Sequence, residues 1–304
     1  STEGSNPFLY SQDGIFWNES ELPFYIGDGA GDYGESVELN ASLYMVSLRS
    51  QPEEGEPLRV ASTTNCADWT ELSVSLPVSI NFSSSSFELE AFANQIWLFG
   101  SSDTGALLLK SSDGATWDAV ATPAWGTSAD GVETVSTPER LVVLASLSGG
   151  TGTYVWSTTD GSNWTQSSVV IPSSGSMYGV EMVYANGALW TFGTPEGEMY
   201  GSEMYGALAL YKSTDWGNSW SQVTTNLSIQ QDYDIELMAL APSPGLLYAA
   251  GYSAYISEDG SDWSKVSSTN YEDFDVSSTG KFWVTESLNA GTDTVLHSIG
   301  GPLR

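Results

Sequence analysis

Short apolar segments, separated by turns rich in glycine, serine and asparagine, run along the whole 304-residue chain. No long stretch repeats its apolar residues with the 3.6-residue period of a helix, whereas the alternation typical of strands is frequent. One region predicts four successive strands most clearly, over residues 87–93, 95–100, 106–111 and 116–121. The same order recurs around Val132, Val180 and Ile235. The pattern therefore predicts an all-β protein built from repeated four-stranded units.

A turn motif with the pattern Ser/Thr-x-Asp-Gly-x-x-Trp joins the last two strands of each unit, and we call it the Ser-Asp-Gly-Trp repeat. Its regular copies end at Trp17, Trp117, Trp164 and Trp263. The copy ending at Trp220 is one residue longer, and the copy ending at Trp69 has Cys66 in place of glycine. Serine and aspartate oxygens accept hydrogen bonds from nearby backbone N–H groups, and glycine supplies a positive φ. The tryptophan covers the turn, so the repeat predicts structure rather than catalysis.

This repeat resembles the Asp-box, or BNR repeat, of the sialidase-like β-propellers. The resemblance implies a turn between the third and fourth strands of a blade, remote from any active site. The spacing of the tryptophans is close to the length of a propeller blade. We expect a single domain over residues 1–304, folded as a β-propeller of six four-stranded antiparallel blades. Seven blades are the alternative.

The two ends of the chain each contain part of a blade. Residues 7–11 and 15–18 have the pattern of a third and a fourth strand, and residues 274–277, 281–286 and 294–298 that of a first, second and third strand. We expect the two ends to complete one blade together and close the ring, which would leave no open sheet edge.

The charge is strongly negative, since 38 acidic residues face 8 Lys and Arg residues, for a formal net charge of −30. Such a field repels nucleic acid and anionic membranes and attracts cations and basic proteins, and it also favours solubility. Cys66 is the single cysteine, which excludes an intramolecular disulfide. No signal segment or membrane-spanning run is evident, and a chain that starts at Ser1 is expected to be processed or truncated. We expect an extracellular, periplasmic or cell-surface location.

An acidic residue follows an apolar one in each predicted first strand. These acids are Glu38, Glu90, Glu133, Glu181, Glu236 and Asp275. First strands surround the channel of a propeller, so we expect the six carboxylates to gather at the channel mouth and bind a ligand. Glu181, Glu236 and Asp275 are the expected metal ligands, with Ca²⁺ as the ion, because calcium takes oxygen ligands. In the alternative, the acids point between blades and accept hydrogen bonds from backbone N–H groups of a neighbour.

The longest insertion, over residues 194–206, belongs to the same face as the expected channel mouth. Its tandem sequence includes Tyr200 and Tyr205, whose flat rings suit stacking on a sugar or packing on a partner. Both tyrosines are therefore candidate ligand-binding residues.

Several activities are disfavoured by the residues present. Sialidases clamp a carboxylate with three arginines, one in an Arg-Ile-Pro motif, and Leu58-Arg59-Val60 does not match it. The single histidine, His297, supports neither a Ser-His-Asp triad nor, with one cysteine, a zinc site. We expect an extracellular binding or adhesion module for a divalent cation, a neutral glycan or a basic protein surface. The alternatives are a glycoside hydrolase acting on an uncharged glycan, with its catalytic residues undetermined, and a non-catalytic scaffold.

Overall fold

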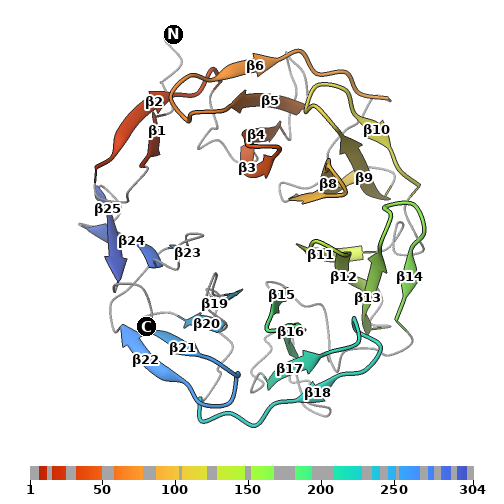
Figure 1. Cartoon of the computed structure of the whole chain (residues 1–304), viewed down its shortest axis with the longest axis vertical. Helices are drawn as coiled ribbons and strands as arrows, with labels where there is room; N and C mark the ends of the chain where they lie inside the picture. The colour runs from red at the N-terminus through yellow and green to blue at the C-terminus, as the bar shows by residue number, and fades with distance from the viewer. Residues whose placement is uncertain are drawn as a thin grey trace. The chain divides into compact units, whose positions relative to one another are not determined.

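Every regular element in the described part of this computed structural model is a β-strand (Figure 1). The structure describes residues 7–11, 16–24, 32–49, 58–77, 87–102, 105–121, 129–147, 152–167, 182–193, 209–227, 235–239, 246–250, 253–267, 273–276, 282–288 and 293–299. Contacts divide the chain into two compact units, Ser1–Leu141 with Thr158–Trp164 and Val142–Ser157 with Thr165–Arg304. Each unit is described by itself, and the single domain over 1–304 stays a prediction.

Five of the described sheets have four strands in consecutive antiparallel order, as the apolar pattern predicts. The first contains β3 (Asp32–Leu39), β4 (Ser42–Arg49), β5 (Leu58–Thr63) and β6 (Thr70–Leu72), and the second contains β7 (Glu88–Phe92), β8 (Gln95–Ser102), β9 (Gly105–Ser111) and β10 (Asp118–Ala119). The third contains β11 (Ala129–Ser136), β12 (Leu141–Leu147), β13 (Gly152–Thr158) and β14 (Thr165–Gln166).

The fourth sheet contains β15 (Met182–Ala185), β16 (Ala188–Gly193), β17 (Ala209–Ser213) and β18 (Ser221–Gln222). The fifth contains β19 (Ile235–Ala239), β20 (Leu246–Ala250), β21 (Ser253–Ser257) and β22 (Ser264–Ser267). Within the units, β7 contacts both β3 and β11, and β19 contacts both β15 and β23. Within each unit, the first strands of successive sheets are therefore neighbours.

The chain ends form two smaller sheets. A hairpin pairs β1 (Pro7–Tyr10) with β2 (Asn18–Glu21), and a three-stranded sheet contains β23 (Asp273–Val276), β24 (Phe282–Leu288) and β25 (Asp293–Ile299). The hairpin belongs to the first unit and the three-stranded sheet to the second. Closure of the ring through one shared blade therefore stays a prediction.

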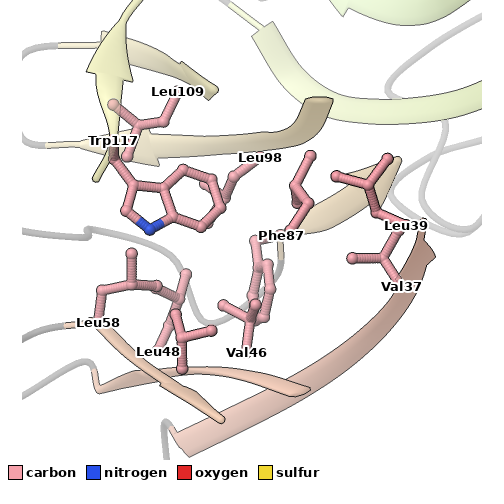
Figure 2. Close-up of a cluster of buried hydrophobic side chains, with 11 residues drawn as sticks. Val37, Leu39, Val46, Leu48, Leu58, Phe87, Leu98, Leu109 and Trp117 are labelled. Atoms are coloured by element: carbon pink, nitrogen blue, oxygen red, sulfur yellow. The ribbon is translucent and has the colours of Figure 1, made fainter. Parts of the chain in front are cut away.

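Apolar side chains between the sheets β3–β6 and β7–β10 form the largest described core. Figure 2 shows Trp117 beside Leu109 and Leu98, opposite Leu48 and Leu58. Trp117 is 1% exposed, so the last residue of a Ser-Asp-Gly-Trp repeat is a core residue here. Burying a large apolar side chain of this kind contributes about 1.5–3 kcal/mol, which explains its recurrence at blade spacing.

Tight turns end three of the first strands. Asn40 and Ala41, Ala93 and Asn94, and Asn186 and Gly187 have positive φ at both central positions, as a type I′ hairpin requires. Because this turn matches the right-handed twist of the strands, it fixes the register of the first two strands.

The Ser-Asp-Gly-Trp repeats have the hydrogen bonding that the sequence predicts. Asp113 Oδ1 accepts the N–H groups of Ala115 (2.9 Å) and Thr116 (2.8 Å), and Ser111 Oγ accepts that of Gly114 (2.8 Å). The carboxylates of Asp160, Asp215 and Asp259 hold their turns in the same way. A structural role is confirmed at these four aspartates, whereas Asp13 lies outside the described residues.

The copy with Cys66 keeps the turn by other means. Asn65 Oδ1 accepts the N–H groups of Ala67 and Asp68, both at 2.9 Å, and Cys66 takes a φ of 59°. The indole of Trp69 donates to Ser20 Oγ (3.1 Å), which donates to the Cys66 carbonyl (2.8 Å). In two regular copies the tryptophan donates directly to the glycine carbonyl, as Trp117 does at 2.9 Å and Trp263 at 2.8 Å. Ser20 thus ties the N-terminal hairpin to this turn.

Candidate functional site

The structure describes three side chains of the six predicted channel acids. Glu38 is exposed on β3, whereas Glu90 on β7 and Glu133 on β11 are half-buried. Glu236 lies on β19 and Asp275 on β23, but their side chains are not described. Glu181, Tyr200 and Tyr205 lie outside the described residues. Ligand binding at all these positions stays a prediction.

The predicted equivalence of Glu38 and Glu90 is wrong, and the cross-strand register shows why. Glu38 pairs with Leu43 on β4, whereas Glu90 pairs with Trp97 on β8. Leu43 pairs in turn with the first residue of its Ser-Asp-Gly-Trp repeat, Thr63, but Trp97 does not. The matching residue of β8 is Ile96, one position earlier. A one-residue offset moves a side chain to the other sheet face, so Glu38 and Glu90 occupy opposite faces of their sheets.

Alignment by the turn at the end of the first strand gives a different column of acids. In three first strands an acid lies four residues before the last residue that pairs with the second strand. These acids are Glu35 (before Leu39), Glu88 (before Phe92) and Glu133 (before Thr137). Alignment through the cross-strand partners of the repeat that starts at Ser257 adds Glu236, and the sequence places Glu181 four residues before Ala185. We call these five residues the acid column. Counting back from the turn, rather than forward from an apolar residue, would have identified Glu35, Glu88, Glu133 and Glu181 from the sequence.

Glu90 joins two first strands. Its carboxylate accepts hydrogen bonds from the hydroxyls of Ser136 (2.6 Å) and Thr134 (3.4 Å), both on β11. Burial raises the pKa of the Glu90 carboxyl above its ordinary value, although hydrogen bonds from Ser136 and Thr134 favour the charged form. Glu90 thus bonds the neighbouring first strand, but through the hydroxyls of Ser136 and Thr134, whereas the predicted alternative names backbone N–H groups.

Glu88 lies two residues before Glu90 on the same face of β7, because side chains alternate along a strand. It is half-buried. Two positions along a strand span about 7 Å. Glu133, by contrast, lies on the face of β11 opposite to Thr134 and Ser136, and so points away from Glu90. Glu88 and Glu90 therefore form a carboxyl pair on a common face of β7.

Two lysines lie over tryptophan rings of the second strands. Lys110 pairs with Trp97, which pairs with Glu90, and its Nζ lies 5.7 Å from the centre of the Trp97 ring. Lys212 lies in the same way over Trp190, at 4.6 Å. These lysines are used to cover tryptophans of the second strands. Within the described ranges, no group of three or more His, Cys, Asp or Glu residues could hold a metal ion. The expected calcium ligands Glu181, Glu236 and Asp275 are not tested by that result.

Comparison with known proteins defines the class of fold. No protein-family profile matches the chain, and no curated protein matches it in sequence. Solved structures that resemble it include two enzymes in complex with arabinobiose. The GH93 alpha-L-arabinofuranosidase of Fusarium graminearum in complex with arabinobiose is 15% identical, with a TM-score of 0.56 over 91% of this chain and 95% of its own. The alpha-L-arabinanase of Penicillium chrysogenum complexed with arabinobiose is 17% identical, with a TM-score of 0.56 over 90% and 94%.

At such low identity the likeness defines the fold alone. The chain is an all-β protein of the β-propeller class, and its antiparallel four-stranded sheets are the blades. The number of blades stays a prediction. In the part of the chain that is described, no helix has the length and apolar character needed to span a lipid bilayer.

Proposed function

We propose that this protein is a glycoside hydrolase acting on an uncharged glycan. The observation that supports this most is the likeness in fold, over about nine-tenths of the chain, to two enzymes named for arabinose-containing substrates and solved with arabinobiose. A net charge of −30 favours a neutral substrate over an anionic one. The likeness supports the hydrolase, an alternative from the sequence, better than a binding or adhesion module.

Glu90 and Glu88 are the proposed catalytic pair. Glycoside hydrolysis needs one carboxyl group that donates a proton to the leaving oxygen and a second that acts as nucleophile or base, about 5–10 Å away. The raised pKa of Glu90 suits the proton donor. Glu88, on the same face of β7 and about 7 Å away along the strand backbone, is the proposed second carboxylate. The glycosidic C–O bond breaks as Glu90 protonates the leaving oxygen, and water supplies the oxygen of the new hydroxyl group on the sugar. The proton released by that water restores the protonated form of the acid.

The test is hydrolysis by the whole chain. Linear arabinan and a panel of uncharged nitrophenyl glycosides, including the α-L-arabinofuranoside, would be incubated with the wild type, Glu90→Gln and Glu88→Gln. We expect sugar release by the wild type and a loss of kcat of about 100-fold or more in each variant, because an acid or base contributes that much.

Glu21→Gln is the matched control, since Glu21 is an exposed glutamate on β2 with no predicted role in the site. It should keep wild-type kcat. The proposal fails if the wild type releases no sugar from any uncharged glycan, or if both variants remain active. Binding of arabinan without turnover would support the binding module instead. The extracellular, periplasmic or cell-surface location also remains a proposal.

A further inference from the structure

The Ser-Asp-Gly-Trp repeat of the fourth sheet contains an extra residue that the proposed function does not use. Its sequence is Ser213-Thr214-Asp215-Trp216-Gly217, and the inserted residue is Trp216. Trp216 has a φ of +61°, in the left-handed region that a bulky side chain rarely adopts. An L-residue adopts this conformation only at an energetic cost. The chain therefore has an aromatic residue at a position whose backbone conformation glycine would adopt without strain.

The ring of Trp216 stacks on the ring of Tyr184. Their centroids are 5.2 Å apart and their planes 7° from parallel. Tyr184 on β15 pairs with Leu189 on β16, which pairs with Ser213 at the start of the repeat, so one row of the sheet leads from the tyrosine to the turn. The equivalent positions in the sheets β3–β6 and β7–β10 are occupied by Glu38 and Ala91. The fourth sheet therefore differs from those two sheets in two neighbouring residues, Tyr184 on the first strand and the inserted Trp216 in the turn. Each of the two adds an aromatic ring.

Both rings are half-buried, so each has surface exposed to solvent. Two exposed amide side chains belong to the turns that contain or adjoin the pair. Asn186, in the turn after Tyr184, donates to the Glu258 carbonyl (2.8 Å), and Asn218 donates to the Asp215 carbonyl (2.7 Å). Aromatic rings present a flat apolar surface, and amides both donate and accept hydrogen bonds. The apolar faces and the hydroxyl groups of a sugar match those two chemistries.

We propose that Tyr184 and Trp216 form a carbohydrate-binding surface that holds an uncharged polysaccharide chain, separate from the Glu88–Glu90 pair. The choice of a glycan as ligand rests on the proposed function. The acidic neighbours Asp215 and Glu258, in a chain of net charge −30, disfavour an anionic polymer. The pair would keep the protein on a polymer without taking part in cleavage.

The experiment is native affinity electrophoresis of the full chain in gels that contain linear arabinan, together with the melting temperature of each variant. Trp216→Gly is the central variant, because glycine accepts a φ of +61° without strain and the ring is lost. Deletion of Trp216 gives a repeat of regular length as a second test. We expect retardation of the wild type, and an affinity about 3- to 10-fold weaker in both variants.

Phe16→Ala is the matched control, since Phe16 is an exposed aromatic residue (76%) elsewhere in the chain. It should bind as the wild type does. The inference is overturned if Trp216→Gly is retarded normally, if Phe16→Ala loses as much affinity, or if the wild type does not bind. A variant with a lower melting temperature but normal retardation would assign the pair to packing. A changed oligomeric state would assign the pair to contact between copies. Either result also overturns the inference. Hydrolysis of a small nitrophenyl glycoside reports on the proposed function separately, and Trp216→Gly should leave it unchanged.

Discussion

The carboxylate of Glu90 accepts a hydrogen bond of 2.6 Å from the hydroxyl of Ser136, forty-six residues further along the chain. The bond crosses from β7 to β11, the first strands of successive sheets. An acid on an inner strand therefore has a defined partner on its neighbour, and burial and hydrogen bonding act on its charge in opposite directions.

The pH dependence of stability should reveal this balance. Because the pKa of Glu90 is raised in the folded protein, folding favours its protonated form, and that contribution is fully present below the ordinary value of 4.5. It is lost as the pH rises through the folded pKa. Glu90→Gln cannot ionise and keeps an oxygen for Ser136, so its advantage over the wild type should grow between pH 4 and pH 8. Urea denaturation across that range measures the difference.

Glu38→Gln serves as the comparison, because Glu38 is exposed on the opposite sheet face. A Glu90→Gln variant that loses stability relative to the wild type as the pH rises would show that the hydrogen bonds outweigh burial.

Two glycines with nearly the same φ should respond very differently to alanine. Gly161 (φ +71°) lies against Trp97, whose ring a Cβ would overlap, whereas a Cβ at Gly187 (φ +72°) would meet nothing within 4 Å. Gly187→Ala should cost about 1–2 kcal/mol from its backbone alone. Gly161→Ala should cost about 1–3 kcal/mol more, because the core is overpacked. Chemical denaturation of both variants tests this, and equal losses would contradict the contact with Trp97.

The aspartates of the Ser-Asp-Gly-Trp repeats should matter for folding and not for the site. Asp113→Ala leaves two backbone N–H groups without their acceptor and should lower stability by about 1–3 kcal/mol. The backbone N–H of Thr116 is the main cause that lowers the pKa of Asp113, so this contribution is present above pH 3.8 and lost in acid. Asp118→Ala, an exposed neighbour on β10, is the control. Loss of sugar release by a folded Asp113→Ala protein would place the residue in the site.

Calcium binding by Glu181, Glu236 and Asp275 remains to be tested. An ion bound by the folded state alone raises the melting temperature. We therefore expect a higher melting temperature in millimolar calcium than in chelator at matched ionic strength, and a smaller rise in Glu236→Gln. A rise no larger than that given by a monovalent salt would exclude the site and leave these acids a structural role.

Local chemistry made much of the fold predictable. The Ser-Asp-Gly-Trp repeat acts within about seven residues, since Ser111, Asp113 and Gly114 complete their turn without help from distant residues. The four-strand order followed from the apolar pattern between repeats. The hydrogen bond of Trp69 could not be predicted in this way. Its partner Ser20 is forty-nine residues away, and nothing in the local sequence indicates it.

The sequence by itself determined which residues form strands and turns, and that each predicted first strand contains acids. Only the tertiary structure decided which acids are equivalent and which face each one shares. Glu38 and Glu90 both follow an apolar residue, yet β4 and β8 pair them one position out of step. The physical reason is the two-residue period of a strand: an offset of one residue reverses the face, and the offset is set by cross-strand pairing rather than by neighbours in the chain.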